Sequence, residues 1–106
     1  MTSNETREFV GGMCERFKQD VKPFIDNGFF EIAGGQLEQI IQIMTPKLKE
    51  IQDLPSGINY LISIKQLYKQ LAQNKKPSNR MMQEYNAYAA QVQMKRANRQ
   101  NPQMGS

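Results

Sequence analysis

The sequence predicts an all-α fold, a compact bundle of four to five helices whose basic C-terminal helix projects from the bundle or lies along its rim. Apolar residues recur at helical spacing in four segments of the chain. The best candidate strand, "YLISI" at 60–64, is explained better by a helical stripe. Because 106 residues fit one domain, we expect 1–100 to form a single helical domain and 101–106 a flexible C-terminal tail.

The first helix is predicted over residues 3–22. Thr2 and Glu5 have the spacing of a capping box, in which each side chain binds the other residue's backbone N–H. Pro23 disfavours a helical conformation at the residue before it, so the helix should end or bend there. The apolar stripe recurs at every fourth position: Phe9, Met13, Phe17 and Val21.

The second helical segment follows a turn at Asn27-Gly28 and continues to residue 54. Pro46 interrupts it, either as a kink or as the first residue of a new helix capped by Thr45. Because the apolar phase continues through Pro46, we favour a kink or a very tight corner. Gly34-Gly35 should mark a break or a point of close packing. One helical face carries Leu37, Ile40, Ile41, Met44, Leu48 and Ile51.

The third helix has Ser56 as its candidate N-cap and ends before Pro77. Its inward stripe comprises Tyr60, Ile64, Leu67, Tyr68 and Leu71, with Leu61 and Ile62 as a second apolar flank. Ser78 or Asn79 should cap the fourth helix, which is predicted over 80–99 and stopped by Asn101-Pro102. The core face of that helix comprises Met81, Tyr85, Tyr88, Ala89 and Val92.

The charge is distributed unevenly along the chain. Residues 1–53 hold six Lys or Arg and nine Asp or Glu, a net charge of −3, whereas residues 54–106 hold eight and one, a net charge of +7. The last apolar stripe continues at the same azimuth into Lys95, Arg96 and Arg99. Because burying unpaired cations costs several kcal/mol each, we expect the helix to outrun the bundle or to meet negative charge outside it. A solvated helix end is the alternative interpretation.

These charges predict a small non-enzymatic regulatory or assembly protein that binds nucleic acid. Its candidate contacts to phosphates are Lys75, Lys76, Arg80, Lys95, Arg96 and Arg99. Neighbouring amides could bond base edges: Asn79, Gln83, Asn86, Gln91, Gln93 and Asn98. The alternative is a helical protein–protein interaction module, of adaptor or coactivator type, whose groove binds an acidic or amphipathic helix of a partner. The same cations would then contact an acidic protein surface.

A second face of the fourth helix carries small residues and is a candidate surface for a partner helix or a homodimer. Its members are Gln83, Ala87, Ala90, Met94 and Ala97. Alanines are also good helix formers in solvent, so an uncovered face is an equally good interpretation.

The composition argues against most catalytic chemistry. The chain has no histidine and a single cysteine, which excludes Cys/His zinc sites and histidine-based triads. Cys14 should be a buried small apolar residue. We therefore expect no catalysis, no metal and no cofactor. No apolar run is long enough to span a bilayer and no secretion signal is present, so we expect no membrane and a cytoplasmic or nuclear location.

Overall fold

The computed structural model describes residues 2–104, and the side chains of residues 2–93. Over residues 2–104 all regular structure is helical, which confirms the all-α prediction. The α-helices are α1 (Ser3–Arg16), α2 (Lys22–Asp26), α3 (Phe30–Met44), α4 (Leu48–Gln52), α5 (Gly57–Ala72) and α6 (Asn79–Met104). A π-helical segment, Phe17–Val21, joins α1 to α2, and a 3₁₀ turn, Thr45–Lys47, joins α3 to α4.

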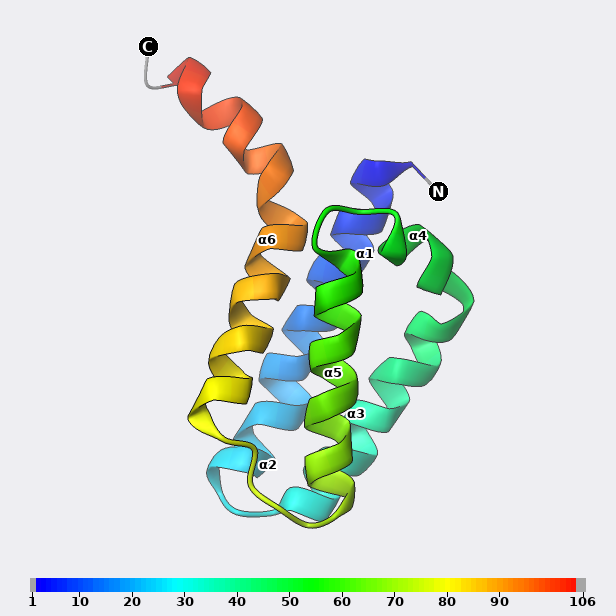
Figure 1. Cartoon of the computed structure of the whole chain (residues 1–106), viewed down its shortest axis with the longest axis vertical. Coiled ribbons are helices and arrows are strands. Elements are labelled where there is room, and N and C mark those ends of the chain that lie inside the picture. Colours follow the sequence, from blue (N-terminus) through cyan, green and yellow to red (C-terminus); the bar gives the residue numbers. More distant parts are fainter. Residues whose placement is uncertain (1, 105–106) are drawn as a thin grey trace.

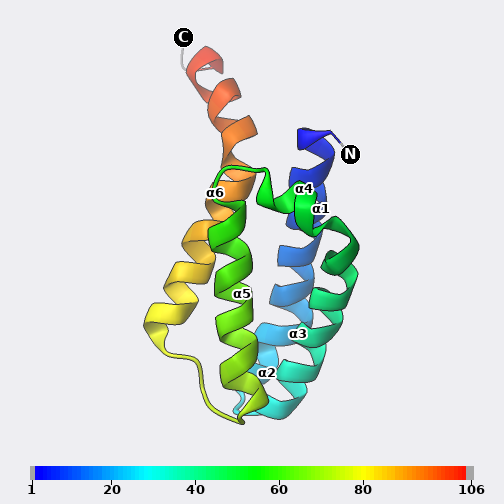
Figure 2. The same ribbon diagram turned by 45° about the vertical axis from the view of Figure 1, so that its right-hand side comes forward.

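The long helices α1, α3, α5 and α6 form a bundle in which successive helices run in opposite directions (Figures 1 and 2). Helix α6 packs between α1 and α5, α5 packs against α3, and α3 packs against the π segment and α2. The short α4 contacts both α1 and α5 at one end of the bundle. Short connections between antiparallel neighbours are typical of up-and-down helical bundles.

The predicted start of the first helix is confirmed. The Thr2 hydroxyl accepts a hydrogen bond from the Glu5 backbone N–H at 3.1 Å, and the Glu5 carboxylate accepts one from the Thr2 N–H at 2.8 Å. The bond from the Thr2 backbone N–H holds the pKa of Glu5 below its ordinary value. Glu5 and Thr2 therefore satisfy two of the free donors at this helix end.

The predicted end of this helix at Pro23 is wrong in detail. Regular α-helix stops earlier, at Arg16, and the rod continues through the π segment into α2. The Lys22 N–H bonds the Phe17 carbonyl, five residues back rather than four. Proline lacks an N–H and its ring clashes with the carbonyl four residues earlier, and the wider π turn accommodates it without breaking the rod.

The second segment turns a tight corner at Pro46, as the favoured interpretation predicts. Helix α3 ends at Met44, the 3₁₀ turn follows, and α4 leaves in a new direction (Figure 2). The corner places Ile51 fully inside the core but leaves Leu48 37% exposed. The single buried face that was predicted for this segment therefore divides at the corner.

The two predicted N-caps of the later helices differ in outcome. Ser78 caps α6, since its hydroxyl accepts a hydrogen bond from the Met81 N–H at 3.2 Å. Ser56 precedes α5 as predicted but does not cap it, because its backbone is left-handed, with φ 64°, and its hydroxyl donates to Gln91 Oε1 at 2.7 Å. Ser56 therefore ties the start of α5 to α6.

The core is built from the predicted stripes of all four long helices. Tyr60, Leu67 and Leu71 of α5 are fully buried, whereas Tyr68, Met81 and Tyr88 are only half-buried and pack at the core's margin. The Phe17 and Tyr85 rings stack with their centroids 4.4 Å apart, which joins the π segment to α6. Cys14 is buried as predicted, and its thiol donates to the Tyr60 oxygen at 3.7 Å.

Candidate functional site

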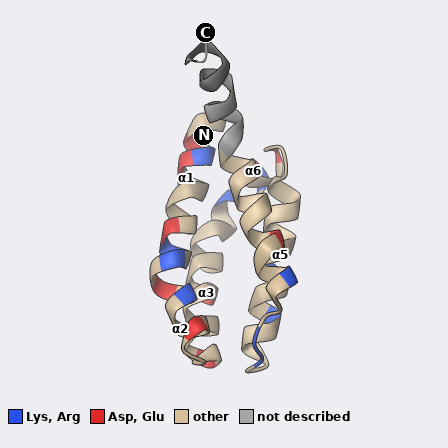
Figure 3. Cartoon of the chain, turned by 90° about the vertical axis from the view of Figure 1, so that its left-hand side faces the viewer, with Lys and Arg blue, Asp and Glu red and all other residues tan. Residues whose placement is uncertain are grey.

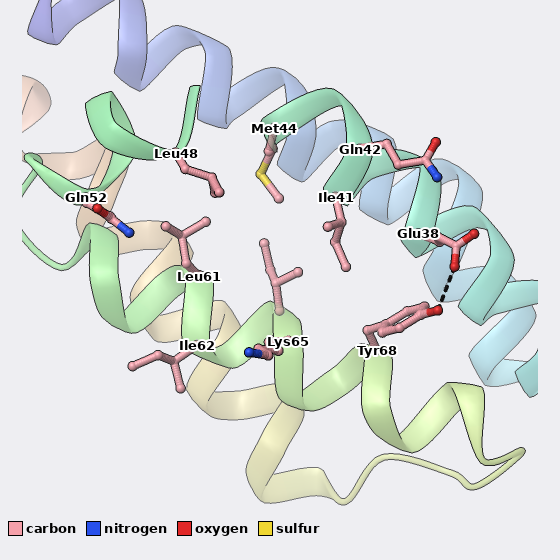
Figure 4. Close-up of a pocket in the computed structure, with 11 residues that line it drawn as sticks. Glu38, Ile41, Gln42, Met44, Leu48, Gln52, Leu61, Ile62, Lys65 and Tyr68 are labelled. Carbon is pink, nitrogen blue, oxygen red and sulfur yellow. Dashed lines mark hydrogen bonds between the residues drawn. The ribbon is translucent and has the colours of Figure 1, made fainter. Parts of the chain in front are cut away.

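An open groove lies between α3 and α5, and α4 contributes to its wall (Figure 4). Its volume is about 620 Å³, within the range of protein binding sites. Side chains of α3 and α5 face each other across it in Figure 4. The lining residues are Glu38, Ile41, Gln42, Met44, Leu48, Gln52, Leu61, Ile62, Ile64, Lys65 and Tyr68.

The half of this groove nearer α4 is apolar and exposed to solvent. Ile62 lines this half and is 49% exposed, and Ile58, which precedes it by one turn on α5 and lies outside the groove lining, is 56% exposed. Leu48 faces the same space, while Ile41 and Leu61 are half-buried against the core. Contiguous exposed apolar side chains of this kind are typical of surfaces that bind a partner.

The other half of the groove is polar. The Tyr68 hydroxyl of α5 donates a hydrogen bond to the Glu38 carboxylate of α3 at 2.6 Å, shown dashed in Figure 4. This bond, followed by the negative charge of Glu38, raises the pKa of Tyr68. This bond joins the two walls of the groove. Lys65 is the cation among the described lining residues.

The structure describes the side chains of three of the six cations in the predicted basic surface, and whether all six gather on one surface stays a prediction. Lys75 and Lys76 are exposed in the connection between α5 and α6, where the chain is blue in Figure 3. Arg80 is exposed in the first turn of α6, and its Nε lies 3.5 Å from the Glu84 carboxylate. Lys95, Arg96 and Arg99 lie outside the residues whose side chains are described. At 1.5 Å per residue, positions 80 and 95 of α6 are roughly 22 Å apart along the helix axis.

Two of the amides predicted to reach base edges are engaged inside the fold. The Gln93 side chain donates to the Cys14 thiol at 3.4 Å and to the Ala89 carbonyl at 2.9 Å. Gln91 accepts the hydrogen bond from Ser56. Asn79, Gln83 and Asn86 are exposed, and Asn98 lies beyond the described side chains.

The predicted small-residue face of α6 is uncovered where it is described. Gln83, Ala87 and Ala90 are exposed, and Met94 and Ala97 lie outside the described side chains. A partner helix or a homodimer on this face stays a prediction.

The apolar pattern of the sequence indicates one wall of the groove but not the other. Leu61 and Ile62 add apolar surface beyond the single face that α5 needs for the core, and both line the groove. The opposite wall depends on how α3 packs against α5, which helical periodicity does not specify.

The described residues contain no group of three or more His, Cys, Asp and Glu side chains that could hold a metal ion. In the same part of the chain, no helix has the length and apolar character that crossing a membrane requires. Comparison with protein-family models, curated proteins and solved structures found no match to this chain. Its functional assignment therefore depends on the geometry of its own surfaces.

Proposed function

We propose that this protein is a non-enzymatic interaction module that binds an amphipathic helix of a partner protein in the groove between α3 and α5. The exposed apolar half of that groove is the observation that carries the proposal. Amphipathic helices bind such grooves through apolar residues spaced three, four and seven positions apart. Covering Ile58, Ile62 and Leu48 would remove apolar surface from water, which drives association.

The proposal is tested with a neutral 16-residue helical peptide that carries leucines at those spacings and glutamines elsewhere. Ile62→Glu places a charge in the apolar half, and we expect it to weaken peptide binding about tenfold, because it removes apolar contact area. Fluorescence anisotropy measures the affinity, and NMR chemical-shift changes map the contacts to α3, α4 and α5.

Ile32→Glu is the matched control. Ile32 is also 49% exposed on a helix, but it does not line this groove. Because both substitutions affect half-exposed side chains, both proteins should unfold at nearly the temperature of the unchanged chain. Equal loss of binding in the two variants, or shift changes away from the groove, would contradict the proposal.

A second candidate function is nucleic-acid binding, and the exposure of Lys75, Lys76 and Arg80 favours it. Lys75 and Lys76 can approach phosphates directly, Arg80 can do so when it leaves its ion pair with Glu84, and Lys95, Arg96 and Arg99 are a second basic group further along the sequence.

Salt dependence tests this candidate. If four to six phosphates are neutralised, the logarithm of the affinity for duplex DNA should fall against the logarithm of salt with a slope near −4 to −5. Replacing Lys75 and Lys76 with Ala should make the slope shallower by about 2, independently of the distal cations. Absence of DNA and RNA binding at low salt would exclude this function and leave the groove proposal unaffected.

A further inference from the structure

The outer stripe of α5 changes character halfway along the helix. Ile58, Ile62, Lys65 and Lys69 follow one another at offsets of four, seven and eleven residues, so they lie on one face. The first two are exposed apolar side chains and the last two are exposed cations. A ligand that lies along this stripe therefore meets apolar surface first and positive charge afterwards.

Neither Lys65 nor Lys69 forms an ion pair with a residue whose side chain the structure describes. Among the described residues, the ion pairs are Arg16–Asp20, Lys18–Glu15, Lys22–Asp26 and Arg80–Glu84, and none includes Lys65 or Lys69. Glu38 is the carboxylate among the groove's described lining residues, and it already accepts the Tyr68 hydroxyl on the α3 side. The positive charge of this stripe is thus available to a partner.

We infer that the partner of the groove is an acidic amphipathic helix, an inference that rests on the proposed function. Its apolar residues cover Ile58 and Ile62, and its carboxylates, one and two turns further along, pair with Lys65 and Lys69. The stripe from 58 to 69 extends over about 16 Å, so roughly three turns of the partner make these contacts.

The charge pattern selects against the other classes of helix. A basic helix would place its cations beside two unneutralised lysines, which costs binding energy and slows encounter. An uncharged helix would gain the apolar contacts alone. Acidic residues add exposed ion pairs, and their attraction to the lysines also raises the association rate at low salt.

Two pairs of peptides of equal length test the inference. All of them carry the leucines of the neutral probe; the acidic pair carries glutamates, and the basic pair lysines, at the two turns next to the leucines. Within each pair the charges precede the leucines in one peptide and follow them in the other, which allows either direction of binding. We expect the acidic peptide to bind at least tenfold more tightly than the basic one at low salt. Lys65→Glu combined with Lys69→Glu should reverse that preference.

Lys18→Glu combined with Lys22→Glu is the control, because it changes the net charge by the same amount on the π segment and α2, away from the groove lining. This control should retain the preference for the acidic peptide. If the neutral probe binds but the acidic and basic peptides bind equally, and the Lys65→Glu and Lys69→Glu double variant has no effect, the acidic partner is excluded. The proposed binding of a helix in the groove is then unaffected. If neither the neutral probe nor any charged peptide binds, the proposed function itself fails.

Discussion

Two adjacent glycines of α3 experience opposite environments. A Cβ atom at Gly34 would lie 3.3 Å from the Leu71 Cβ and 3.4 Å from the Leu71 carbonyl carbon of α5, whereas a Cβ at Gly35 would have nothing within 4 Å. The backbone of α3 therefore lies close to α5 at Gly34. This approach joins the two helices that form the groove.

Alanine substitutions should separate the two positions. Gly35→Ala should stabilise the fold by about 0.5–1 kcal/mol, because alanine favours the helix over the unfolded chain. Gly34→Ala gains the same helical preference but must push α3 from α5, and we expect a net loss of about 1 kcal/mol. Urea unfolding measures both values. Equal stabilisation by the two substitutions would show that α5 yields freely at Leu71.

For single residues, the sequence predicts which side chains are buried better than it predicts which side chains bond each other. The spacing of Tyr85, Ala89 and Val92 on α6 was sufficient to identify its core face, and all three are buried. By contrast, the Tyr68–Glu38 bond joins residues 30 positions apart. Its formation depends on the register of α3 against α5, which neither helix specifies alone.

Helix boundaries show which local signals the tertiary structure overrides. The capping box at Thr2 and the cap at Ser78 form as predicted because their partners lie within three residues. The conformation of the chain just before α5 is instead determined by close packing. A Cβ atom at Gly57 would lie 1.8 Å from the Ile51 carbonyl oxygen. Only glycine permits this approach of α4 to α5, and Ser56 adopts its left-handed backbone at the same connection.

The prolines show the same division between local and tertiary control. Proline chemistry indicates that a regular α-helix cannot continue unchanged, but it does not choose among a kink, a corner and a π turn. At Pro46 the chain turns, because Ile51 becomes buried once α4 changes direction. At Pro23 the rod continues, since Phe17 and Val21 on the π segment are both buried in the core.

Across the whole molecule, the sequence shows which half of the chain is positively charged, but it does not show where those charges lie on the folded surface. The positive half of the chain folds into α5 and α6, which places Lys65 and Lys69 beside the groove and Lys75 and Lys76 at the end of the bundle. The sequence therefore predicted the positive character of this half of the molecule. It did not predict that Lys65 lines a groove, because that position depends on how α3 packs against α5.

The centre of the bundle should make the protein sensitive to alkali. Burial raises the pKa of the Cys14 thiol and of the Tyr60 and Tyr85 hydroxyls above their ordinary values. The unfolded chain releases the Cys14 proton above about pH 8.5 and the two tyrosine protons above about pH 10, and burial delays each release in the native protein, so stability is full below about pH 8.5 and falls as the pH rises. Each group that remains protonated only in the native state lowers the free energy of unfolding by about 1.4 kcal/mol per pH unit.

Tyr85→Phe removes one of these groups while it keeps the ring that stacks on Phe17. Between pH 10 and 11 the free energy of unfolding of this variant should therefore fall less steeply, by about 1 kcal/mol per pH unit, than that of the unchanged chain. Urea unfolding at a series of pH values measures both slopes, and the lysines, common to both proteins, cancel in the difference. Identical slopes would mean that Tyr85 releases its proton in the native protein as readily as in the unfolded chain. Burial would then not raise the pKa of Tyr85.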